Sequence, residues 1–198
     1  IFTSVFECCL NTGMKILISQ EEYVKKTRSY DALERAYYDF LDGHEIIPLP
    51  NLIKVPDIDY DCLILTGGPD SISRNQTENL LYDHAVSKGV PVIGICHGAF
   101  AIADINSSDF NKISGHVDAD IKITMEGKKH TVRCYHSQNI KTLSDEFLVT
   151  SYDQDGNIHS FQHKVLPIYG IVWHPERMNK IVLPKDVAEI LRTNKSRF

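Results

Sequence analysis

The chain has 198 residues, which is enough for one domain with a sizeable core but not for two ordinary catalytic domains. Hydrophobic residues make up 42% and charged residues 24%, the balance of a soluble globular protein. The formal charge of -5, without any basic run to offset it, excludes a broad nucleic-acid or anionic-membrane surface. No apolar stretch approaches the roughly 20 residues of a membrane helix.

The first segment differs from the rest of the chain. Residues 1–13 begin without Met and end directly before Met14, where the apolar run MKILISQ starts. We predict that residues 1–13 are an N-terminal extension and that residues 14–198 form one domain. Five cysteines cannot all pair within the chain, and none has the spacing of a zinc site. These features favour a reducing, cytoplasmic location without metal or cofactor.

The first half of the chain alternates strand and helix patterns. Apolar runs predict strands, and apolar residues at helical spacing predict helices. The strands are expected at 15–19, 45–50, 62–66 and 91–95, and the helices at 31–41, 76–88 and 99–105. Prolines in 45–50 suit an edge strand, and the intervening stretch 21–30 is expected to be a solvated loop. This alternation predicts right-handed crossovers and a mostly parallel sheet.

The second half is rich in strand patterns. Residues 121–125 and 131–135 flank Glu126-Gly127-Lys128, which predicts a hairpin. Further strands are expected at 147–153, 157–163 and 167–173, followed by a helix at 185–192. The predicted fold class is therefore α/β, a mostly parallel sheet flanked by helices, with a β-rich annex.

The strongest local motif is Gly94-Ile95-Cys96-His97-Gly98, which lies between an apolar strand and a predicted helix. This is the context of a nucleophile elbow, where small residues on either side allow the backbone to pass closely. A helix N-terminus also stabilises a thiolate. The motif alone fits a buried structural cysteine equally well.

Two further elements favour catalysis. His174 and Glu176 follow an apolar strand, and they supply the base and the orienting carboxylate that a catalytic thiol needs. Gly67-Gly68-Pro69 follows another strand at the carboxyl edge of the sheet, where α/β ligands bind. The N–H groups of Gly68 and His97 are thus predicted to form an oxyanion hole.

These three motifs, in this order, resemble the class I, triad-type glutamine amidotransferases. The resemblance covers Met14 to about Leu191 and implies the flavodoxin-like three-layer fold of that family. It implies that Cys96 is the nucleophile of a γ-glutamyl thioester, His174 the base and Glu176 its orienter. It further implies that the loop Tyr135, His136, Ser137 binds the glutamyl group through backbone contacts.

Two positions depart from the family pattern. Phe100 stands where these enzymes commonly carry a Gln that holds glutamine, and Val172 stands where a polar residue is frequent. Both departures favour a γ-glutamyl amide larger than glutamine. Gly67 and Phe100 are expected to border this substrate, and Arg28 is the candidate contact for an anionic group on it.

Three functions remain open from the sequence. The first is a stand-alone hydrolase that releases glutamate from a γ-glutamyl amine or amidate, including a phosphate-bearing one as in capsule phosphoramidate assembly. The second is a glutaminase subunit that supplies ammonia to a separate synthetase chain, and the third is a non-catalytic binding or redox protein. Four other histidines show no ligand spacing and are expected at surface or hairpin positions: His116, His130, His159 and His163.

Overall fold

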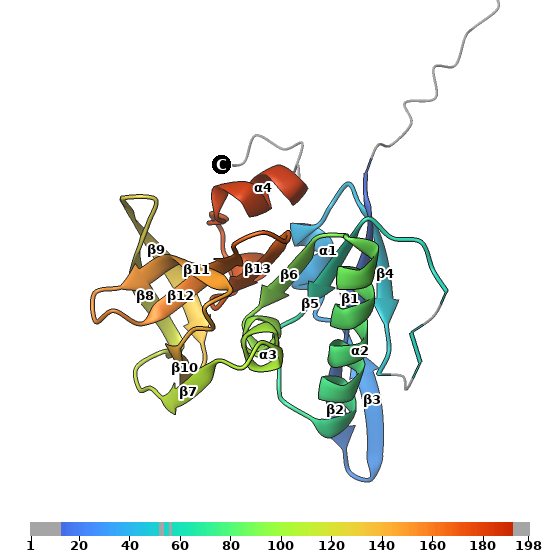
Figure 1. Cartoon of the computed structure of the whole chain (residues 1–198). Coiled ribbons are helices and arrows are strands. Elements are labelled where there is room, and N and C mark those ends of the chain that lie inside the picture. The colour runs from blue at the N-terminus through green and yellow to red at the C-terminus, as the bar shows by residue number, and fades with distance from the viewer. Residues whose placement is uncertain (1–12, 52–53, 56, 192–198) are drawn as a thin grey trace, which may run out of the picture.

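The computed structural model describes residues 13–51, 54–55 and 57–191, so all of the predicted extension except Gly13 lies outside the described residues. Within them, nine strands form one sheet in the order β4-β1-β5-β6-β13-β12-β11-β8-β9 (Figure 1). Strands β4, β1, β5, β6 and β13 run parallel, and the remaining pairs are antiparallel. The predicted α/β fold with a β-rich annex is confirmed.

The parallel half consists of short, buried strands. Their bounds are β1 Lys15–Ser19, β4 Glu45–Leu49, β5 Cys62–Leu65, β6 Val92–Ile95 and β13 Ile168–Ile171. Strand β4 forms the predicted edge and contains Pro48, whose missing N–H is tolerated there. Because the carboxyl ends of parallel strands share one edge, the loops after β5, β6 and β13 meet there.

The antiparallel half forms the annex. Its strands are β8 Val117–Met125, β9 Lys128–Tyr135, β11 Phe147–Asp153 and β12 Ile158–His163. Strands β8 and β9 form the predicted hairpin around Glu126 and Gly127, both of which have positive φ. Two strands that the sequence did not predict, β7 Asp109–Lys112 and β10 Gln138–Thr142, pair beside the annex.

Helices cover both faces of the sheet and give three layers (Figure 1). On β5, Ile64 packs into one core and Leu63 into the other, because alternate side chains point to opposite faces. Helices α2 Ile72–Lys88 and α3 His97–Ile105 cover the core that contains Leu63. Helices α1 Ala36–Phe40 and α4 Lys185–Leu191 cover the other core.

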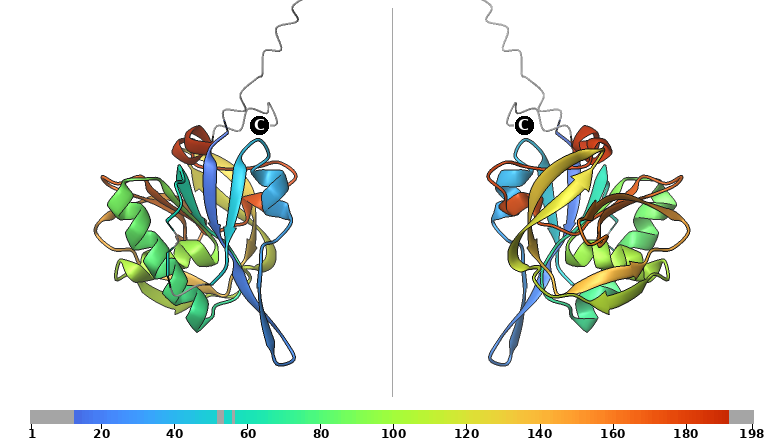
Figure 2. Two further views of the ribbon diagram at one scale, coloured as in Figure 1. Left: turned by 90° about the vertical axis from the view of Figure 1, so that its right-hand side faces the viewer. Right: turned by 90° about the vertical axis from the view of Figure 1, so that its left-hand side faces the viewer.

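Two predictions for the first half are wrong. Residues 21–32 form a hairpin of β2 Glu21–Lys25 and β3 Arg28–Ala32 that projects from the body (Figure 2), instead of a loop. The predicted helix at 31–41 is reduced to α1, because residues 31–32 are still paired in β3. Conversely, α2 begins four residues earlier than predicted, since the hydroxyl of Ser71 caps it by accepting the N–H of Arg74.

No helix in the described part of the chain is long and apolar enough to cross a membrane.

Candidate active site

Cys96 lies at the turn between β6 and α3 with φ 49° and ψ −103°, a backbone conformation that residues with a side chain rarely adopt. The turn depends on its two glycines. A Cβ on Gly94 would lie 2.5 Å from the carbonyl of Gly98, and a Cβ on Gly98 would collide with the carbonyl of Leu65. The structure thus has the strained strand-to-helix turn that the motif predicts, with the thiol largely buried.

His174 follows β13 and lies beside this thiol. Its Nδ1 is 2.6 Å from Oε1 of Glu176, which belongs to the short 3-10 helix Pro175–Arg177. Burial alone would lower the pKa of His174. Hydrogen bonds to Cys96 and Glu176, and the negative charges of both groups, instead raise this pKa to about 9. The side chains of Cys96, His174 and Glu176 therefore form one connected row.

The glycine loop after β5 packs directly against this row. A Cβ on Gly67 would lie 2.5 Å from Cε1 of His174, so only glycine allows the ring this position. The N–H of Gly67 donates to the hydroxyl of Tyr37 at 2.9 Å, and the N–H of Gly98 donates to the carbonyl of Thr66. These two N–H groups are therefore engaged in the fold, and the role of the Gly68 and His97 N–H groups as an oxyanion hole stays a prediction.

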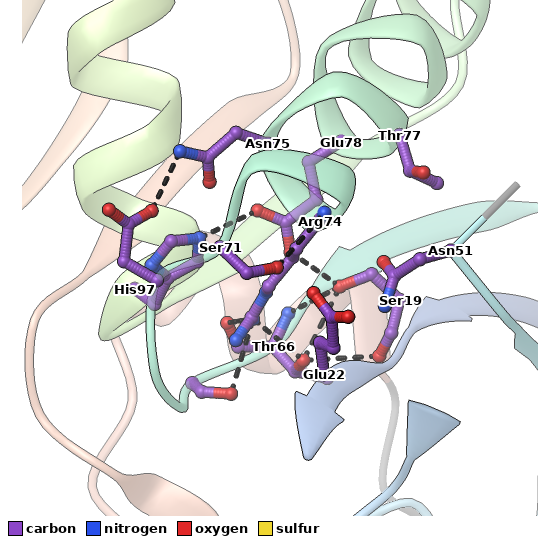
Figure 3. A network of polar contacts seen from close by, with 12 residues as sticks. Ser19, Glu22, Asn51, Thr66, Ser71, Arg74, Asn75, Thr77, Glu78 and His97 are labelled. Atoms are coloured by element: carbon purple, nitrogen blue, oxygen red, sulfur yellow. Dashed lines mark hydrogen bonds and ion pairs between the residues drawn. The ribbon is translucent and has the colours of Figure 1, made fainter. Parts of the chain in front are cut away.

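A buried polar network contacts the glycine loop (Figure 3). We call it the loop network, and its members are Ser19, Thr66, Arg74, Glu78 and His97. The guanidinium of Arg74, which is fully buried, donates to the carbonyls of Thr66 and Gly67 and to Glu78 Oε1. Glu78 also accepts from Ser19 and lies 3.0 Å from Nε2 of His97. The ring of His97 thus connects the helix after Cys96 to the loop after β5.

The sequence did not indicate Tyr37, Arg74 or Glu78 as site residues. Arg74 and Glu78 are four residues apart on α2, a spacing that usually indicates a solvated ion pair on a helix surface. Burial raises the pKa of Glu78. The hydrogen bond to His97 and the charge of Arg74 together lower this pKa by more, so the carboxylate stays ionised. The signal that could have revealed this pair is the position of α2 directly after the glycine loop.

The predicted substrate loop follows β9. The ring of Tyr135 meets the ring of His174 edge-on at 5.3 Å, and the guanidinium of Arg177 lies over the ring of Tyr135. His136 is buried and its Nδ1 bonds to the carbonyl of Gln138, whereas Ser137 is exposed. Only the Tyr135 side chain of this loop therefore contacts the Cys96 row.

Phe100 and Arg28, the other predicted substrate residues, differ in their surroundings. Phe100 is buried on α3, where its ring packs against Phe110 and His136. Arg28 is exposed, and its backbone lies opposite that of Lys25 where the two strands of the projecting β2–β3 hairpin meet (Figure 2). Its contact with a substrate stays a prediction.

Two cavities lie near the site. One, of about 270 Å³, is lined by His97, Phe100 and Gln138 together with the carboxylates of Asp70 and Asp104. The other, of about 550 Å³, borders Tyr135 and is called the basic cavity here. It is lined by Lys129, Arg133, Arg177 and Lys180, with Asp120 as its acidic residue.

The expectation that His116 and His159 occupy surface positions is wrong. Both are buried in the annex, where they gather with Cys134, His136 and Asp153. We call these five residues the histidine cluster. They are distant in sequence, and the pairing of β8, β9, β11 and β12 brings them together. His130 and His163, in contrast, are partly exposed.

Comparison with known proteins identifies relatives of the chain. A family model described as glutamine amidotransferase class-I matches residues 33–182. The chain is 30% identical over 140 residues to a subunit of the glutamine-hydrolyzing GMP synthase of Methanosarcina mazei, covering 65% of this chain and 72% of that protein. It is 28% identical over 146 residues to the gamma-glutamyl-CDP-amidate hydrolase of Campylobacter jejuni, covering 67% and 72%.

A solved structure supports the fold. The glutamine amidotransferase of Thermotoga maritima superposes with a TM-score of 0.66 at 12% identity, over 91% of this chain and 83% of that one.

Proposed function

Because the chain belongs to the class I glutamine amidotransferase family, we propose that it hydrolyses a γ-glutamyl amide bond through a thioester on Cys96. One observation carries this proposal. The strained turn presents the Cys96 thiol to His174, and Glu176 holds His174 on its other side. A thiol, a base and an orienting carboxylate in one row are the components of cysteine-dependent acyl transfer.

The chemistry begins with an ion pair. With the pKa of His174 raised to about 9, its imidazole is protonated at neutral pH and can stabilise the thiolate of Cys96. The thiolate attacks the γ-carbonyl carbon, a C–S bond forms, and the carbonyl oxygen takes the negative charge. When the C–N bond breaks, His174 gives its proton to the leaving nitrogen.

Water completes the cycle. His174, now neutral, takes a proton from a water molecule that attacks the thioester carbon, and the C–S bond breaks to release glutamate and the thiolate. In both tetrahedral states the oxyanion accepts from the N–H groups of Gly68 and His97. Losing one such donor typically costs about 10²–10³ in rate.

The substrate class follows from the surroundings of the row. Phe100 offers no polar group that could bind the α-amino or α-carboxylate group of glutamine. Without that contact, we expect binding to depend on the leaving group of the substrate in addition to its glutamyl part. The basic cavity borders Tyr135, whose ring contacts His174. The guanidinium of Arg133 already binds Asp118 and Asp120, and that of Arg177 binds Glu34. Lys129 and Lys180 are therefore the side chains of this cavity that suit phosphate oxygens. A γ-glutamyl amidate that carries phosphate is therefore the proposed substrate, and the relationship to the gamma-glutamyl-CDP-amidate hydrolase supports this choice.

Mass spectrometry of the trapped acyl-enzyme tests the nucleophile. Purified chain is mixed with glutamine, a γ-glutamyl amine or a γ-glutamyl nucleotide amidate and quenched with acid. We expect a γ-glutamyl adduct on Cys96, and no adduct in Cys96→Ala. The matched control is Cys62→Ala, which removes another buried thiol, in β5, and should retain the adduct. An adduct that persists in Cys96→Ala would refute the proposal.

Substitutions in the basic cavity test the leaving group. Lys180→Gln should raise KM about 10-fold for the nucleotide amidate, since a lost charged hydrogen bond costs about 1.5–3 kcal/mol. KM for an uncharged γ-glutamyl amine should not change. Lys141→Gln, which removes an exposed lysine on β10, is the control. Equal effects on both substrates would exclude phosphate recognition by this cavity.

A second candidate is a glutaminase subunit that supplies ammonia to a separate synthetase. The relative in Methanosarcina mazei, which is named as a subunit of a glutamine-hydrolyzing synthase, favours it. This function predicts weak glutaminase activity of the isolated chain, increased by a co-purifying synthetase. Full hydrolytic activity of the isolated chain on an amidate, with none on glutamine, would exclude it.

A further inference from the structure

We propose that Cys134, His136 and His159 of the histidine cluster bind one Zn²⁺ ion behind the substrate loop. This site is separate from the γ-glutamyl chemistry and does not depend on it. Each of the three residues offers one donor atom, and these atoms all lie within 4.8 Å of one another. All three residues are buried: Cys134 near the end of β9, His136 directly after β9, and His159 near the start of β12.

His136 carries the first argument. Its Nδ1 lies 2.8 Å from the carbonyl of Gln138, which can only accept, so Nδ1 is the protonated nitrogen. Its Nε2 must then present a lone pair, and this buried atom has no hydrogen-bond partner among the described residues. Leaving a buried lone pair without a partner is unfavourable. A bound cation would accept that lone pair.

His159 has a looser arrangement. Its Nδ1 lies 3.9 Å from Sγ of Cys134, and its Nε2 lies 3.6 Å from the carboxylate of Asp153, too far for a hydrogen bond. Metal-binding histidines usually donate their second ring N–H to a carboxylate or a backbone carbonyl, which fixes the tautomer and the ring orientation. Gln138 supplies that carbonyl to His136, and Asp153 is the carboxylate that faces the second nitrogen of His159.

The distances agree with zinc. In a tetrahedral site with Zn–S near 2.3 Å and Zn–N near 2.0 Å, donor atoms are about 3.3–3.6 Å apart. The separation of 3.9 Å between Cys134 Sγ and His159 Nδ1 closes to this value with small side-chain rotations. One thiolate and two imidazoles are ligands that zinc prefers over magnesium or calcium. Water can complete the shell, since both ring nitrogens of His116 already face other acceptors.

The second group in the cluster is better explained without a metal. His116, Asp153 and His159 also lie close together, but Oδ2 of Asp153 already accepts from the side chain of Asn157 at 2.8 Å. The same oxygen lies 3.1 Å from Nε2 of His116. The two ring nitrogens of His116 therefore face the carboxylate of Asp153 and the carbonyl of Ser114, and neither is left for a metal.

Zinc binds the thiolate form of cysteine, so binding displaces the proton of the Cys134 thiol. Binding converts Cys134–SH and Zn²⁺ into a Zn–S bond and one released proton.

Metal titration of the full chain tests the site. Chelator-treated protein is titrated with Zn²⁺ against a chromophoric chelator, and with Co²⁺ followed by absorption. We expect one ion per chain and a thiolate-to-cobalt charge-transfer band. The unfolding temperature of the wild type should rise with added Zn²⁺, since a ligand at 100 times its Kd stabilises by about 2.7 kcal/mol.

Five variants identify the ligands. Cys134→Ser and His136→Gln should lose the ion, the cobalt band or both, and their unfolding temperatures should no longer respond to Zn²⁺. Cys62→Ser and Cys96→Ser remove the other two described thiols and should keep all three signals. A chain with Cys8→Ser and Cys9→Ser controls for the adjacent cysteines of the N-terminal segment.

Three results would overturn the inference. The first is that the wild type binds no zinc and shows no thermal response. The second is that zinc binding survives Cys134→Ser. The third is that zinc binding is lost when Cys8 and Cys9, or Cys96, are replaced. In the first case the cluster is a metal-free core of neutral histidines.

Discussion

The loop network and the histidine cluster are both buried polar groups, and they differ in how completely their hydrogen bonds are satisfied. In the loop network, Arg74 and Glu78 use their polar atoms on each other, on Ser19, His97 and the glycine loop. In the histidine cluster, ring nitrogens of His136 and His159 are buried without a hydrogen-bond partner among the described residues. A closed network indicates a positioning role, whereas an open one indicates room for a ligand.

We expect the largest effect from removing the positive charge of Arg74 from the loop network. Arg74→Met leaves the carboxylate of Glu78 buried without its guanidinium, which should cost about 3–5 kcal/mol of unfolding free energy in urea denaturation. The control is Lys185→Met, which removes an exposed ion pair with Glu189 and should cost about 0.5 kcal/mol or less. Equal costs would show that the loop network does not stabilise the fold.

The next largest effect is expected from removing the negative charge of Glu176 beside His174. Glu176→Gln removes the negative charge that helps to raise the pKa of His174 to about 9. In the wild type, kcat/KM should fall as pH rises through about 9, because His174 loses the proton that it gives to the leaving nitrogen. In the variant we expect this alkaline limb at lower pH and a loss in kcat/KM of about 100-fold or more.

Rate measurements from pH 5 to pH 11 on both proteins check this effect. An unchanged alkaline limb in Glu176→Gln would contradict the assigned role of the carboxylate. Far-ultraviolet circular dichroism across the same range separates loss of activity from unfolding.

A smaller effect is expected where the loop network meets the turn. His97→Leu removes the partner of Glu78 Oε2, which should cost about 1–3 kcal/mol and lower kcat more than it raises KM. His97→Gln keeps a donor at this position and should recover part of both losses. If His97→Leu and His97→Gln behave alike, the ring serves packing alone.

The smallest effect is expected in the open cluster when metal is absent. Replacing His136 by Leu removes an unsatisfied nitrogen, so the chelator-treated variant should unfold within about 1 kcal/mol of the chelator-treated wild type. Urea denaturation in chelator measures this difference. A loss of stability as large as that of Arg74→Met would mean that the loop network and the histidine cluster do not differ in how completely their hydrogen bonds are satisfied.

Local motifs predicted the parts of the site that one short segment determines. Cys96 with its glycines, and His174 with Glu176, each lie within five residues of chain, so strand ends and spacing were sufficient to place them. The alternation of strands and helices likewise predicted the parallel half of the sheet and its edge strand β4. The resemblance to class I amidotransferases added the three-layer fold.

Long-range pairing determines what the sequence did not reveal. His116, His136 and His159 gather only because β8, β9, β11 and β12 pair in one particular register, which spacing along the chain does not encode. Arg74 looks like a surface residue until the glycine loop covers it. The helix predicted at 31–41 fails because strand pairing in the β2–β3 hairpin outweighs helical propensity over its first residues.

The backbone conformation at Cys96 determines which substitution at this position would stabilise the protein. At φ 49° and ψ −103°, glycine is the residue that fits without strain. A lineage released from selection for catalysis would gain stability by exchanging this cysteine for glycine, with the fold intact. A descendant with glycine at this position should therefore be more stable than a chain that keeps the cysteine.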